Sequence, residues 1–133
     1  MSNPAHFNRH SVLIIQNVSK MKDFLFVFRS ETSPRTNSSP EQLQANMKLW
    51  MDWIGGIAAQ NKLIDRGNRL ENAGKVVKPG NLVTDGPYSE TKELIGGYTL
   101  VKAGSLEEAA EMAKGCPVLT FGGNVEVREI GQM

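Results

Sequence analysis

Hydrophobic and polar positions along this chain follow two periods, one typical of strands and one typical of helices. The run from Phe24 to Phe28 is apolar at every position. Such a run predicts a central strand that is covered on both of its faces. The last apolar alternation, from Val125 to Ile130, places Val125 and Val127 on one side and predicts a strand with one polar face.

A long amphipathic helix is the clearest element of the pattern, and we expect it from about Pro40 to Gln60. Ser39 and Gln42 have the spacing of a capping box, and Pro40 suits the first helical position. One stripe of apolar residues recurs at helical spacing: Leu43, Met47, Trp50, Ile54 and Ile57. Gly55 and Gly56 lie on the opposite side, where a close backbone approach would explain them.

Short strands and a second helix follow. We expect a strand over Leu63–Arg66 that Arg69 and Leu70 continue, and a further strand over Val76–Val83, interrupted near Pro79 and Gly80. Gly96–Gly97 leads into another strand, and Ser105 with Glu108 forms a second capping box. Its helix ends at Gly115 and Pro117.

This order predicts an α+β, ferredoxin-like βαββαβ domain with an extra hairpin. Residues 21–133 form the domain, and residues 1–20 form an extension with a polar tail and a possible edge strand over Ser11–Gln16. Two helices would cover one face of the sheet. Because Leu25 and Val27 leave the other face apolar at its centre, we expect a homodimer that packs sheet to sheet.

Composition excludes several partners. The 133 residues carry a formal net charge of +1, which argues against direct binding of nucleic acid or of an anionic membrane. The chain has a single cysteine, Cys116, which we interpret as structural, and it shows no signal-like N-terminus, so we expect a cytoplasmic protein. His6 and His10 lack a third ligand, and we predict neither a metal nor a cofactor.

The segment from Asp85 to Glu93 concentrates groups that could carry chemistry. We predict that this loop walls a polar cleft, with Asp85, Tyr88, Glu90 and Lys92 as its main contributors. The alternative is a structural connection in which Asp85 satisfies the turn and Lys92 pairs with an acid.

Three residues outside the loop are further candidates for this site. Arg29 and Arg69 lie near the ends of predicted strands, and Trp53 lies on the flank of the helical stripe, where a cleft or a dimer contact would place it. Trp50 lies at the centre of the stripe, where we expect it in the core; the alternative is that it lines an aromatic ligand pocket.

The sequence TDGPYSETKELIGGY at residues 84–98 closely resembles the signature of the DGPF, or YCII-related, family, with Tyr88 where phenylalanine is commoner. The resemblance extends from about Met21 to Ile130 and includes RGNRL at 66–70 and GGNVEVREI at 122–130. It implies a ferredoxin-like fold that dimerises as a dimeric α/β barrel. It also implies a bacterial source and, in many cases, gene neighbourhood with extracytoplasmic-function sigma factors.

The family leaves two functions open. Some members carry a histidine in the first helix and an aspartate near its end, proposed as an acid–base dyad, but Trp50 stands at or near that histidine position here. We therefore favour a domain that binds a small polar molecule, with a regulatory role linked to sigma factors. The alternative is a cofactor-free isomerase, lyase or oxygenase that uses Asp, Glu, Tyr or Lys as acid and base.

Overall fold

The structure, a computed structural model, describes residues 20–31, 39–86 and 94–132. Its main sheet is antiparallel throughout and has the order β2-β5-β1-β6. These strands are β2 (Leu63–Asp65), β5 (Leu94–Ala103), β1 (Lys22–Ser30) and β6 (Asn124–Glu129). The strand order and the two helices confirm the predicted α+β, ferredoxin-like fold, and β1 is central as expected.

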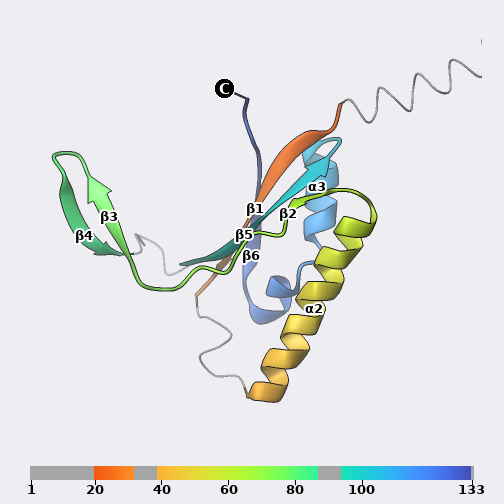
Figure 1. Ribbon diagram of the computed structural model, residues 1–133, viewed down its shortest axis with the longest axis horizontal. Coiled ribbons are helices and arrows are strands. Elements are labelled where there is room, and N and C mark those ends of the chain that lie inside the picture. The colour runs from red at the N-terminus through yellow and green to blue at the C-terminus, as the bar shows by residue number, and fades with distance from the viewer. Residues whose placement is uncertain (1–19, 32–38, 87–93, 133) are drawn as a thin grey trace, which may run out of the picture.

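Two helices lie on one face of this sheet, as Figure 1 shows: α2 (Pro40–Ala59) and α3 (Leu106–Ala113). A short 3₁₀ helix, η2 (Pro117–Phe121), leads from α3 toward β6. Phe24 and Phe26 of β1 are fully buried beneath the helices, beside Val101 of β5. Because each buried phenylalanine contributes about 1.5–3 kcal/mol, this face holds the layers together.

The start of α2 follows the predicted cap. The amide of Gln42 donates to Ser39 Oγ at 3.2 Å, and the amide of Ser39 donates to Gln42 Oε1 at 3.0 Å. The glycines at 55 and 56 do not have the close neighbour that we suggested, since a Cβ on either would meet nothing within 4 Å in this chain.

The second capping box is only half formed. Ser105 Oγ accepts from the amide of Glu108 at 3.1 Å, as predicted. The carboxylate of Glu108, however, accepts from the amide of Gly104 at 3.1 Å and from Lys62 Nζ at 2.7 Å. The charge of Lys62 explains this choice, because a charge-assisted hydrogen bond is stronger than a neutral one.

The strand expected over Val76–Val83 is instead a hairpin of β3 (Gly74–Lys78) and β4 (Leu82–Gly86). Gly80 and Asn81 both have positive φ, at 82° and 60°, and so reverse the chain. Figure 1 shows the hairpin projecting away from the main sheet. Its apolar side chains are exposed, with Val77 at 69% and Leu82 at 57%.

The extension over residues 1–20 lies outside the described residues except for Lys20, so the expected edge strand over Ser11–Gln16 does too. Within the described ranges, neither helix combines the length and the apolar character needed to cross a membrane.

Candidate functional site

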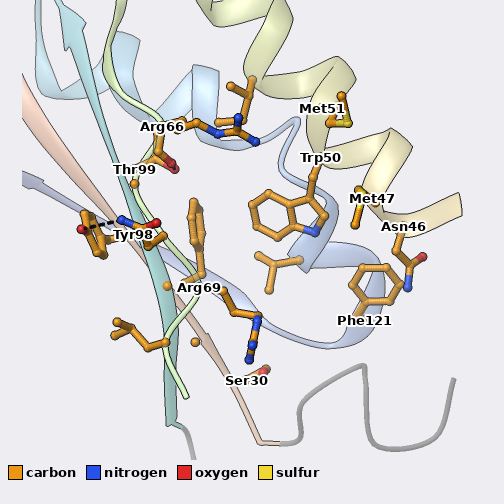
Figure 2. A pocket seen from close by; sticks show the side chains of 18 of the residues that line it. Ser30, Asn46, Met47, Trp50, Met51, Arg66, Arg69, Tyr98, Thr99 and Phe121 are labelled. Atoms are coloured by element: carbon orange, nitrogen blue, oxygen red, sulfur yellow. Dashed lines mark hydrogen bonds between the residues drawn. The ribbon is translucent and has the colours of Figure 1, made fainter. Parts of the chain in front are cut away.

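A cavity of about 460 Å³ lies between α2 and the start of β5. Its walls come from five places in the sequence: the end of β1, α2, the segment 66–72, the first part of β5 and the η2 helix. Figure 2 shows this arrangement from close by, with Trp50 of α2 facing the segment that carries Arg66 and Arg69. The volume falls within the range of about 300–1,000 Å³ that is typical of small-molecule sites.

The segment 66–72 continues β2 as an irregular wall along β5. The amide of Tyr98 donates to Asn68 O at 3.3 Å, and the amide of Leu70 donates to Gly96 O at 2.8 Å. Arg69 forms an isolated antiparallel bridge with Gly97, so the expected continuation of the strand past Gly67 is confirmed.

Glycine is required at the bend of this wall. Gly67 has φ of 72°, and its amide donates to Asp65 Oδ1 at 2.8 Å. A Cβ at Gly67 would lie 1.7 Å from the carbonyl oxygen of Tyr98. The close approach of two backbones therefore brings Arg66 and Arg69 to the cavity, and only glycine permits it.

Aromatic and sulfur-containing side chains form the apolar side of the cavity. The rings of Trp50 and Phe28 meet edge to face with centroids 4.8 Å apart, an arrangement that aromatic pairs prefer. Met47 and Met51 line the cavity from α2 and are more than half exposed, at 57% and 58%. Because methionine is flexible and polarisable, this side can adapt to ligands of different shape.

Positive charge marks the opposite wall. Arg66 and Arg69 line the cavity, and among the described lining residues there is no aspartate or glutamate. Arg69 forms an ion pair with Glu71, which lies outside the lining. The cavity therefore joins an apolar surface to a cationic rim.

Of the four main residues of the predicted loop site, the structure describes only Asp85. Asp85 lies on the projecting hairpin, where its side chain is 96% exposed and accepts from Lys75 Nζ at 3.0 Å. It does not line the α2–β5 cavity. Tyr88, Glu90 and Lys92 lie outside the described residues. Leu94, the first described residue after the loop, lines the cavity.

The other predicted site residues are also separated. Arg69 lines the cavity, whereas Arg29 is not among its lining residues and lies 3.8 Å from Glu126 in an ion pair on β6. Trp53 is not in the lining either; its indole stacks on Phe26 with centroids 5.9 Å apart and donates to Met112 O at 3.0 Å. The structure thus brings only Arg69 of these three to the cavity.

The sequence does not single out Arg66, and for Trp50 it favours the core over the lining of an aromatic ligand pocket. Trp50 packs against the core, as expected, and also lines the cavity. The signal for Arg66 was the RGNRL segment, whose glycine at 67 marks a bend between two arginines. A central position on a helical stripe does not distinguish a core residue from one that also faces a cavity.

Two ionisable groups with shifted pKa values lie away from the cavity lining. The hydrogen bond from Lys62 lowers the pKa of Glu108, and this pair links the end of α2 to the start of α3. Burial raises the pKa of the Cys116 thiol to about 12. Cys116 is 2% exposed and stays protonated at neutral pH, which agrees with a structural role.

The described lining offers binding groups more than acid–base catalysts. Its polar side chains other than the arginines are amides and hydroxyls: Asn46, Asn68, Asn72, Ser30, Tyr98 and Thr99. Thr99 Oγ1 donates to Arg66 O at 2.9 Å, and Tyr98 points away from Trp50, its hydroxyl accepting from Asn68 (Figure 2). These two hydroxyls therefore support the 66–72 wall.

Comparison with solved structures gives a weak likeness to an amidase of the hydantoinase/carbamoylase family from Burkholderia phymatum. The TM-score is 0.28 and the identity 13%, over 84% of this chain and 28% of the amidase chain. No curated protein matches the sequence. The model of the YCII-related domain, in contrast, matches residues 25–133, which include both helices, every described residue of the cavity and the main sheet except for the first three residues of β1. The chain therefore belongs to the YCII-related family.

Proposed function

We propose that this YCII-related domain binds a small organic molecule in the cavity between α2 and β5. The observation that carries the proposal is the cavity itself, in which Trp50, in edge-to-face contact with Phe28, faces the segment that carries Arg66 and Arg69. An apolar hollow with a few convergent polar groups is the usual form of a small-molecule site. The lining favours a ligand with an apolar body, in place of the wholly polar ligand expected from the Asp85–Glu93 loop.

Binding is favoured over catalysis by the chemistry of the described lining. General acid–base catalysis needs a group that titrates near the working pH, most often histidine or a carboxylate. The described lining residues include neither histidine nor aspartate nor glutamate. The enzyme alternative would therefore rest on Tyr98, whose hydroxyl accepts a hydrogen bond from Asn68, or on Tyr88, Glu90 or Lys92, which lie outside the described residues.

The proposal also includes a homodimer formed through the sheet face opposite the helices. The register pairs Leu25 with Leu100 and Val27 with Tyr98, which gives this face an apolar centre. A second copy of the same face is its simplest cover.

A metabolite screen by thermal shift, followed by turnover assays on each hit, tests the binding proposal. Met51→Trp should fill the cavity from its exposed side and weaken the binding of hits by about tenfold or more, which corresponds to about 1.4 kcal/mol. Leu49→Trp is the matched control, because Leu49 is on the same helix and 49% exposed but does not line the cavity.

Two results would contradict the proposal. If Met51→Trp and Leu49→Trp bind every hit as the wild type does, the ligand lies elsewhere. If a hit is consumed at a catalytic rate, the enzyme alternative replaces simple binding.

A further inference from the structure

The two arginines of the cavity differ in what they contact. Arg69 is held in an ion pair with Glu71. The guanidinium of Arg66 has no hydrogen bond or ion pair with any residue that the structure describes. Figure 2 shows it extending from the 66–72 wall toward the side of α2 that carries Trp50 and Met51. Arg66 thus presents free donors beside an apolar surface.

The charge balance of the cavity matches a single negative charge. Glu71 offsets the charge of Arg69, which leaves about one net positive charge at the described lining, on Arg66. A guanidinium is planar and presents parallel N–H donors that fit the two oxygens of a carboxylate. Arg66 is exposed in the free chain, so the ion pair gains strength when the apolar body of the ligand and the cavity wall exclude water from it.

The aromatic surface in the same cavity as Arg66 indicates the rest of the ligand. Trp50 and Phe28 form a continuous edge-to-face pair, and Met47 and Met51 border it. A flat ring system gains both buried area and aromatic contacts on such a surface. An aliphatic chain would gain only the buried area.

We propose that the cavity selects aryl carboxylates, with the carboxylate on the guanidinium of Arg66 and the ring against Trp50. This inference rests on the proposed function and adds the class of ligand to it. It assigns Arg66 as the residue that distinguishes anionic from neutral ligands, and it assigns to Arg69 a structural role in the wall through its pair with Glu71.

Matched probes test this assignment. Benzoate, phenylacetate and 1-naphthylacetate are titrated into the full chain by calorimetry at fixed ionic strength, each beside its own carboxamide. We expect the best carboxylate to bind about tenfold or more tightly than its carboxamide, equal to about 1.4 kcal/mol. Arg66→Gln should remove this preference and leave the affinity for the carboxamide unchanged. Lys48→Gln is the control, because it removes an exposed charge from α2 outside the cavity lining and should keep the preference.

Each other outcome overturns a defined part of the account. Equal binding of carboxylate and carboxamide would leave the binding function standing and remove the anion selectivity. A preference that persists in Arg66→Gln would place the anion site elsewhere. If no member of either series binds the wild type, while its fold is intact by circular dichroism, the aryl carboxylate assignment falls; the small-molecule function falls only if the metabolite screen also gives no hit.

Discussion

At the scale of single residues, the cavity depends on Gly67 more than on any charged group. Its φ of 72° turns the chain after β2, and its missing side chain lets the backbone approach Tyr98. The guanidinium of Arg66 and the bridge from Arg69 to Gly97 both follow from this bend. A residue without a side chain thus positions the residues that carry the charge.

We therefore predict that Gly67→Ala destabilises the protein strongly. Alanine at position 67 would have a strained φ. Its Cβ would also lie 1.7 Å from Tyr98 O, so the two backbones would have to separate. We expect a loss of about 2 kcal/mol or more in the free energy of unfolding, measured by urea denaturation.

Gly80→Ala separates the two contributions. Gly80 has a similar φ of 82°, but nothing lies within 4 Å of the position of its Cβ. It should cost only the strain of a left-handed alanine, about 1 kcal/mol. Equal losses in the two variants would show that the contact with Tyr98 has no energetic weight.

At the scale of elements, sequence patterns predicted most of the architecture. Three local patterns each predict an element that the structure contains. They are the apolar run of β1, the helix cap at Ser39 and the alternation of β6. The predicted fold includes an extra hairpin, but the segment that forms it, β3 and β4, reads in the sequence as a single interrupted strand. Pro79 and Gly80 indicate a turn and do not show whether the chain continues or reverses.

The candidate site was less predictable, for a physical reason. The loop signature predicts Asp85 as a site residue, yet its carboxylate lies on an exposed hairpin, where it forms an ion pair with Lys75. The cavity is built by contacts that no local pattern encodes, such as the pairing of Asn68 with Tyr98, 30 positions apart. Trp53 shows the same limit, since only the structure reveals that Met112 O accepts its indole N–H.

At the scale of the whole molecule, we expect the protein to form a homodimer. The helices cover one face of the sheet, and in the described part of the chain no helix covers the other (Figure 1). On that second face Leu25 and Leu100 are partly exposed neighbours. Val27 on the same face is 8% exposed, so the apolar surface open to a partner is centred on the leucines. Exposed apolar surface of this kind is typical of a dimer contact.

Size-exclusion chromatography with light scattering tests the dimer. We expect a mass near twice the chain mass of 14.6 kDa at micromolar concentration. Leu100→Arg should shift the protein to the monomer, because it would bury an unpaired charge at the sheet interface. Leu49→Arg, on the exposed side of α2, should leave the dimer intact. A wild-type protein that elutes as a stable monomer would contradict the expected assembly.

The central claim is that the ligand occupies the cavity between α2 and β5, and the methionine methyl groups test it most directly. The chain is labelled with ¹³C at its methionine methyls and titrated with the tightest ligand from the screen. Met47 and Met51 line the cavity, whereas Met112 packs against the core outside the lining. We predict intermolecular nuclear Overhauser effects from the ligand to the Met47 and Met51 methyl groups and none to the Met112 methyl group. Saturable binding without any such effect at Met47 or Met51 would contradict it.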